Sequence, residues 1–156
     1  MTTMVFPICT LRPFERGIQE QLGRYKRFAM PGLEFQIPFI HITRVRDIRE
    51  HTIDIHPQAV ITKDNVEILV DGIIWVWSTI DEEPIKRTFY NIDDWKRAIV
   101  QLAMTHLRQE FGDLTLEESL VARETIATNL QRILNTYAVE WGLTVSKVEI
   151  RLIRAL

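Results

Sequence analysis

Apolar and polar residues alternate over short stretches through most of the first half of the chain, a pattern typical of β-strands. The turn signals between them include Pro31-Gly32 and Lys63-Asp64-Asn65, and Asn65 suits a turn because asparagine tolerates a left-handed backbone. This pattern predicts strands at 5–11, 16–22, 24–28, 33–37, 41–49, 53–55, 59–62 and 66–80.

The predicted strand at 66–80 carries large apolar side chains on both of its faces. A strand of this kind is typical of the centre of a sheet that is covered on both sides. We therefore expect a central strand with two buried faces. One face holds Val66, Ile68, Val70, Ile74 and Val76, and the other holds Leu69, Ile73, Trp75 and Trp77.

The second half of the chain has helical periodicity. Asn91 is the expected N-cap of a first helix that Gly112 ends, and Thr115 with Glu118 forms a capping box that opens a second helix. Gly142 ends the second helix, and a last strand follows with a bulge expected at Ser146-Lys147.

The order of these elements predicts an α+β fold rather than alternating β-α-β units. We expect a single domain over 1–156, with an antiparallel sheet in its strand-rich part (1–84). The remainder (85–156) is expected to contain two helices and the final strand.

The charge of the chain argues against a nucleic-acid partner. The formal net charge of the 156 residues is −2, whereas binding to phosphate backbones needs a concentrated basic surface. The charge is uneven, because residues 1–51 hold eight Lys/Arg and five Asp/Glu. No run of about 18 apolar residues is present, so we expect the chain itself to be soluble and not to span a membrane.

The residues that could support catalysis or metal binding do not form a recognisable pattern. The four histidines (His41, His51, His56 and His106) lack the close spacing of metal ligands, and no serine lies in a nucleophile motif. The single cysteine, Cys9, lies in an apolar run that favours a buried thiol. We expect no catalytic residue, no metal and no cofactor.

Cations and aromatic residues are interleaved at 24–28. Lysine and arginine can contact lipid phosphates while tyrosine and phenylalanine sit at the level of the headgroups. The alternative is a hairpin that covers the core, and the pattern does not separate the two. The candidate lipid-facing residues are Arg24, Tyr25, Lys26, Arg27 and Phe28.

Several motifs in collinear order resemble the stomatin/prohibitin/flotillin domain, also called the SPFH or Band 7 domain, and in particular its stomatin-type members. These motifs are Leu22-Gly23-Arg24-Tyr25, Pro31-Gly32-Leu33, Ile61-Thr62-Lys63-Asp64-Asn65-Val66 and Trp141-Gly142-Leu143. The resemblance covers nearly the whole chain. It implies an α+β domain without catalytic residues that is held at a membrane and forms oligomers. Stomatins usually add an apolar membrane segment before this domain and a coiled coil after it, and we expect both to be absent from 1–156.

The resemblance implies a non-enzymatic scaffold that organises lipid microdomains or regulates membrane proteins such as channels or membrane-bound proteases. We expect it at the cytoplasmic face of a membrane. The alternatives are a soluble adaptor that binds a protein partner without touching lipid, and a hydrolase built on Asp and His. Self-association is expected through the final strand, where an apolar edge seeks a partner. The candidate residues are Val148, Ile150, Leu152 and Ile153.

Overall fold

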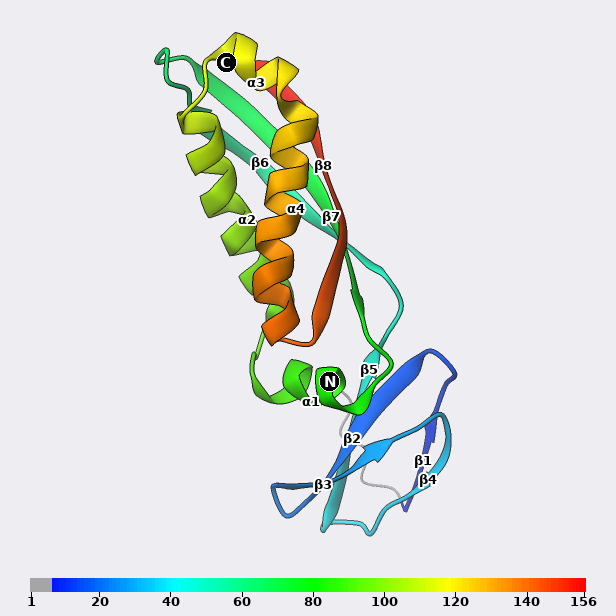
Figure 1. Ribbon diagram of the computed structural model, residues 1–156. Helices are drawn as coiled ribbons and strands as arrows, with labels where there is room; N and C mark the ends of the chain where they lie inside the picture. The colour runs from blue at the N-terminus through cyan, green and yellow to red at the C-terminus, as the bar shows by residue number, and fades with distance from the viewer. Residues whose placement is uncertain (1–6) are drawn as a thin grey trace.

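The computed structural model describes residues 7–156, apart from the side chains of residues 152–154. The chain forms an elongated molecule with a small all-β unit at one end and a larger α/β unit at the other (Figure 1). In the small unit the strands are β1 (Ile8–Leu11), β2 (Glu15–Gln21), β3 (Arg24–Ala29), β4 (Gly32–Phe35) and β5 (His41–Asp47). In the larger unit they are β6 (His51–Ile61), β7 (Glu67–Ser78) and β8 (Leu143–Ala155). The helices are α1 (Glu82–Tyr90), α2 (Trp95–Gly112), α3 (Leu116–Val121) and α4 (Arg123–Glu140).

All strand pairs in the described part of the chain are antiparallel, so the α+β prediction is confirmed. The small unit holds a sheet in the order β3-β2-β5 and a two-stranded ribbon of β1 and β4. The larger unit holds a sheet in the order β6-β7-β8. Strand β7 is central in this sheet, as expected, and β8 forms one of its edges.

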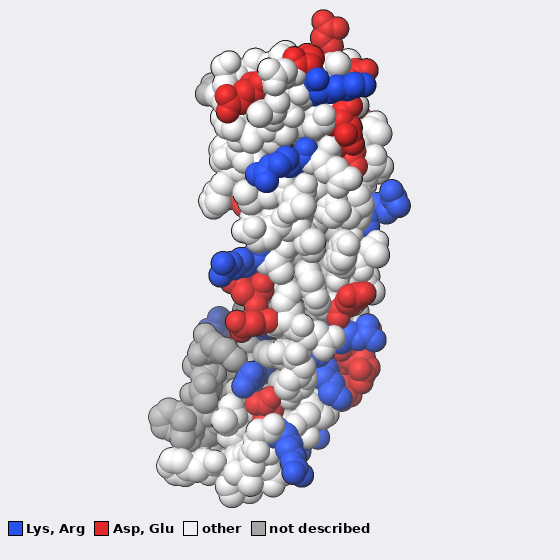
Figure 2. All heavy atoms as spheres, turned by 90° about the vertical axis from the view of Figure 1, so that its left-hand side faces the viewer, with Lys and Arg blue, Asp and Glu red and all other residues white. Residues whose placement is uncertain are grey.

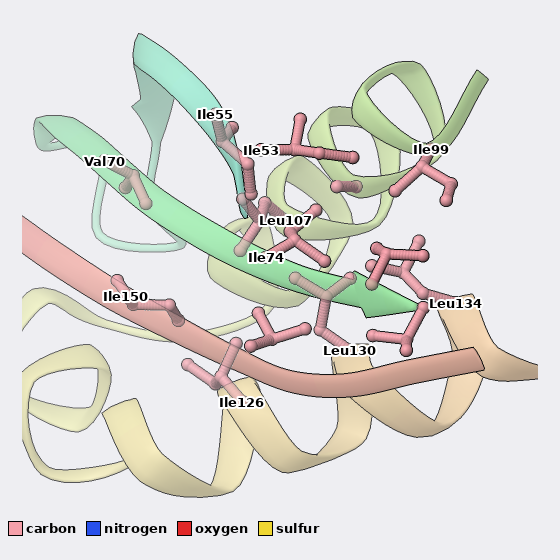
Figure 3. Packing of buried hydrophobic residues seen from close by; sticks show 14 of the residues in the cluster. Ile53, Ile55, Val70, Ile74, Ile99, Leu107, Ile126, Leu130, Leu134 and Ile150 are labelled. Carbon is pink, nitrogen blue, oxygen red and sulfur yellow. The ribbon is translucent and has the colours of Figure 1, made fainter. Parts of the chain in front are cut away.

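The main hydrophobic core lies between the larger sheet and two long helices, with α2 against β6 and α4 against β8 (Figures 1 and 3). Helices α2 and α4 present apolar side chains every third or fourth residue to this core, which is the period of an amphipathic helix. The sheet contributes one face of each strand. Labelled core residues in Figure 3 include Ile74, Ile99, Leu107, Leu130, Leu134 and Ile150.

The expectation that both faces of the central strand are covered is wrong. Along β7 buried residues alternate with half-buried or exposed ones, because α2 and α4 lie on the same side of the sheet. Trp77, on the open face, is 37% exposed. Charged side chains of β8 shield part of this face. Lys147 lies 5.3 Å from the centre of the Trp75 ring, and Arg151 pairs with Asp71 at 2.9 Å.

The second half contains four helices where the sequence predicted two. Helix α1 was missed, and the second predicted helix is divided at Ala122 into α3 and α4. The expected N-cap is also wrong, because Asn91 is the C-cap of α1 and Asp94 caps α2 by accepting from the Arg97 amide. The predicted capping box is confirmed: the Thr115 side chain and the Glu118 side chain each accept from the other's backbone N–H.

Two local predictions in the larger unit are confirmed. The register between β7 and β8 shifts where Trp75 pairs with Lys147 and Val76 pairs with Val145, so Ser146 is the extra residue of a bulge. Asn65, in the turn between β6 and β7, has a φ of 61°.

We expect Asn65→Val to lower the free energy of unfolding by roughly 1–2 kcal/mol, because a side chain branched at Cβ resists the left-handed region. Chemical denaturation of the two proteins measures this difference. Asn65→Gly is the control and should retain the parent stability, since glycine adopts positive φ readily. An equal loss of stability in both variants would show that the asparagine side chain, and not the backbone conformation, stabilises the turn.

Helix α1 links the small unit to the larger one. On its small-unit side, the Tyr25 hydroxyl donates to Glu82, and the Tyr90 hydroxyl donates to Glu20 at 2.8 Å. On its other side, the Thr88 hydroxyl lies 2.7 Å from the Trp141 carbonyl oxygen, at the end of α4. These contacts fix the orientation of the two units relative to each other.

Candidate functional site

Large apolar side chains lie exposed along the surface of the small unit. Phe39 is 88% exposed, Leu22 is 74% exposed and Phe35 is 65% exposed. A backbone hydrogen bond connects the turn after β2 to the loop before β5, since the Leu22 amide donates to the Ile40 carbonyl at 3.0 Å. We call this surface the apolar band, and it comprises Ile8, Leu22, Leu33, Phe35, Ile37, Phe39 and Ile40.

The interior of the small unit is largely polar, which explains why the apolar band faces outward. Gln19, Gln36, His41 and Thr43 are buried, and so is Ile18, while the apolar cluster there comprises Cys9, Leu11 and Ala29 with Val45 against them. The buried side chains are hydrogen-bonded: Thr43 donates to Gln36 at 2.9 Å, and Gln19 donates to the Phe35 carbonyl at 3.0 Å. A satisfied network of this kind holds β4 and the following loop with their polar side inward.

The sequence predicted residues 24–28 as lipid-facing, but the structure exposes only some of them and partly buries the others. Arg24, Lys26 and Arg27 are exposed, and Arg27 pairs with Glu34. Tyr25 and Phe28 are partly buried, and Tyr25 is held against α1 by Glu82 and by Lys86, whose ammonium lies 4.2 Å from the ring centre. The aromatic residues on the outer surface come instead from the chain around 35–39.

Lys26 is directed to His41 by a bulge in β3. The β2–β3 register passes from Gln19 opposite Arg27 to Glu20 opposite Tyr25, which leaves Lys26 without a cross-strand partner on β2. Its Nζ lies 3.0 Å from His41 Nε2, while His41 Nδ1 accepts from the Ile37 amide at 3.1 Å. Burial lowers the pKa of His41 first of all, and the positive charges of Lys26 and Arg27 lower it further.

The residues predicted for self-association lie on the edge strand β8. Val148 and Ile150 are buried in the chain's own core, so their side chains face α4 rather than a neighbouring molecule. The backbones of Leu152 and Ile153 pair with Asp71 and Val70, and their side chains lie outside the described residues.

A groove of about 890 Å³ lies between the outer edge of β8 and the helices α3 and α4. The α4 side chains protect this edge at one point, where Asn135 accepts from the Val145 amide at 3.1 Å and Gln131 donates to the Val145 carbonyl at 2.9 Å. Beyond the bulge the edge runs past Lys147 and Glu149, and both residues line the groove.

The described residues contain no group of three or more His, Cys, Asp or Glu side chains placed to hold a metal ion. His51 instead packs edge-on against Trp95, and His106 lies against Tyr137. None of the helices in the described chain combines the length and the apolarity needed to cross a membrane.

The exposure of the apolar band is the feature that the sequence analysis missed. The alternation of Leu33, Phe35 and Ile37 with Glu34 and Gln36 was visible in the sequence. The signal that could have predicted this exposure is the polar character of the paired strands β2 and β5, which carry Gln19, His41 and Thr43. These polar side chains fill the interior of the small unit.

Comparison with known proteins places the chain in a family. The model of the SPFH domain / Band 7 family matches residues 10–155. An uncharacterized protein of Methanothermobacter thermautotrophicus is 43% identical over 90% of this chain, which covers 43% of that protein. An uncharacterized protein of Methanocaldococcus jannaschii is 34% identical over 95% of this chain, which covers 72% of it. The stomatin-like protein stl-1 of Caenorhabditis elegans is 33% identical over 88% of this chain, which covers 41% of it.

The chain spans less than half the length of the first and the last of these relatives. The match nevertheless extends over both units of the fold, from β1 to the end of β8. The protein belongs to the SPFH domain / Band 7 family, whose members are membrane-associated scaffold-type proteins and generally not enzymes.

Proposed function

We propose that this domain attaches to the cytoplasmic face of a membrane and self-assembles there as a non-enzymatic scaffold. In this role it organises membrane microdomains or regulates membrane proteins such as channels or membrane-bound proteases. The apolar band carries the proposal. Several large apolar side chains exposed on one small unit indicate a contact with a membrane or a protein partner, and family membership favours the membrane.

The cations beside the apolar band suit an anionic leaflet. Arg24 follows Leu22 by two residues, and Lys26 contacts His41 at the end of the loop that carries Phe39. Each cation near an anionic surface contributes about 1 kcal/mol. Figure 2 shows one face of the molecule, where uncharged residues form the lower end and a Lys or Arg side chain lies beside them.

We expect Phe39→Ser to weaken binding to liposomes by roughly 30-fold, because burying one large apolar side chain is worth about 2 kcal/mol. Co-sedimentation with liposomes that contain anionic lipid measures the partition. Val121→Ser is the matched control, since Val121 is 89% exposed but lies on α3, away from the small unit. The proposal fails if the parent does not bind liposomes, or if the two variants lose binding equally. A parent that never binds lipid would favour the soluble adaptor.

Self-assembly is proposed through the free edge of β8, with a second copy of the chain as the partner. Lys147, Glu149 and Arg151 alternate in charge along the outer face of β8. When two such strands pair antiparallel about Val148, each Lys147 lies opposite the Glu149 of the other copy, and opposite charges at such positions attract. An unpaired edge also offers backbone hydrogen bonds. The contact area is small, so we expect a weak, concentration-dependent equilibrium.

Sedimentation velocity across a wide concentration range tests the pairing. Lys147→Glu should shift the equilibrium toward monomer, because it places carboxylates opposite each other. The exchange Lys147→Glu with Glu149→Lys restores opposite charges across the pair, so this double variant should associate like the parent. A monomer at every concentration, or a double variant as weak as the single one, would contradict the pairing.

A further inference from the structure

The hydrogen bond from the Ile37 amide determines which nitrogen of His41 carries a proton. The amide donates to Nδ1 at 3.1 Å, so Nδ1 is the acceptor nitrogen and holds no hydrogen. In a neutral imidazole the proton is then on Nε2. His41 is buried and its pKa is lowered, which keeps the ring neutral near pH 7.

This tautomer directs two donors at each other. The Nε2–H group of His41 lies 3.0 Å from the Nζ atom of Lys26, and an ammonium group donates hydrogen bonds but accepts none. Within residues 7–156, the polar atom found within hydrogen-bonding distance of Lys26 Nζ is His41 Nε2. The pair therefore presents two donors from which one oxygen atom can accept.

The charges around the pair favour an anion as the acceptor. The charged groups that act on His41 are Lys26 and Arg27, both on β3, and the residue opposite His41 on β2 is the neutral Gln21. The carboxylate of Glu34 is held by Arg27. The loop from Gln36 to Ile40 contributes no ionisable side chain.

We propose that Lys26 and His41 form a binding site for a phosphate group, with one phosphate oxygen accepting from Lys26 Nζ and from His41 Nε2–H. Lys26 is exposed, so the site opens to the surface of the small unit, and Ile37 of the apolar band donates to the other side of the same ring. The phosphate of an anionic lipid headgroup is therefore within reach when the band meets a membrane. The headgroup assignment rests on the proposed function, whereas the phosphate chemistry does not.

The tautomer and the ligand are tested together by NMR of the ¹⁵N-labelled protein. The expected result is a His41 ring protonated at Nε2 and a pKa of His41 that rises on addition of inorganic phosphate, because the anion offsets the charge of Lys26. A ring protonated at Nδ1, or a His41 signal that does not respond to phosphate, would overturn the site.

Two substitutions of His41 separate the role of each ring nitrogen. His41→Asn keeps an oxygen near the Nδ1 position for the Ile37 amide but removes the second donor, so phosphate binding should fall about tenfold, as for the loss of one hydrogen bond to a charged group. His41→Gln restores a donor near the Nε2 position and should recover part of the binding. Equal binding by the Asn and Gln variants would contradict the proposed contact.

Lys26→Met tests the site without changing the buried ring, and Lys63→Met, in the turn at the far end of the larger unit, is its control. The Lys26 variant should lose the phosphate response and the Lys63 variant should keep it. A response that persists in Lys26→Met would overturn the site.

Two ligands distinguish the source of the phosphate group. Dihexanoyl phosphatidic acid should shift His41 more strongly than inorganic phosphate if the headgroup is the ligand, and the reverse order would overturn the headgroup assignment. Phe39→Ser should retain the response to inorganic phosphate even where it loses liposome binding. Failure of the phosphate site and failure of membrane attachment are thus observed in different experiments.

Discussion

Replacing Gly142 with alanine is expected to lower the free energy of unfolding by roughly 4 kcal/mol or more, a loss that few single substitutions cause. Gly142 connects α4 to β8 with a φ of +71°, and a Cβ atom there would lie 1.8 Å from the carbonyl oxygen of Pro84 in α1. The Pro84 oxygen belongs to the backbone and the Cβ atom is fixed by the backbone of residue 142, so relief requires α1 to move away from the α4–β8 turn. Urea denaturation measures the loss.

Gly23→Ala is a matched control for this prediction. Gly23 also has positive φ, +79°, but a Cβ atom there meets nothing within 4 Å. Gly23→Ala should lower the free energy of unfolding by only about 1 kcal/mol, the cost of holding alanine in a left-handed backbone conformation. If the two variants lose the same stability, the close approach between Gly142 and Pro84 has no energetic role.

The second large effect is expected in the main core, where Phe111→Ala should lower the free energy of unfolding by about 3–5 kcal/mol. Phe111 is fully buried near the end of α2, and its removal leaves a cavity between that helix and the sheet. Thermal and urea unfolding measure the change. Val121→Ala, at a position that is 89% exposed, should change stability by less than about 0.5 kcal/mol.

A loss well below this range would show that neighbouring side chains collapse into the space. The slope of the urea dependence should be unchanged in Phe111→Ala, since the native surface is similar. A lower slope together with lower stability would instead show that the native state of Phe111→Ala is already partly unfolded.

Much of the fold followed from local signals that tertiary packing does not override. The Thr115–Glu118 capping box, the positive φ of Asn65 and the bulge at Ser146 each depend on backbone demands within a few residues. The segregation of strands and helices along the chain was enough to predict α+β.

Helix α1 was missed because its sequence gives a weak local signal. Its first turn is Glu82-Glu83-Pro84, which resembles the end of a strand, although proline is tolerated in the first turn of a helix. The helix buries Ile85 and Thr88, and those contacts come from residues far away in the sequence. The break at Ala122 likewise has no glycine or proline to announce it.

The direction that an alternating strand faces could not be predicted from the alternation itself. Strand β7 is apolar on both faces and buries one of them, whereas β4 alternates Leu33, Glu34 and Phe35 and exposes its apolar side. The difference lies in the partners, because β4 and its loop pack against Gln19 and Thr43 and not against a helix. The sequence therefore pointed to the segment 24–28, whereas the exposed aromatic side chains of the small unit are Phe35 and Phe39.

Because the molecule is elongated, a small change of tilt at one end displaces the other end by a larger distance. Strand β8 has 13 residues and so extends about 40 Å. Helix α1 and its tyrosine–glutamate contacts hold the small unit to one end of this strand, so the two units tilt together. A tilt of about 10° at the small unit displaces the far end of an arm of that length by about 7 Å. Small adjustments at one end of the domain thus become movements as large as a side chain at the other.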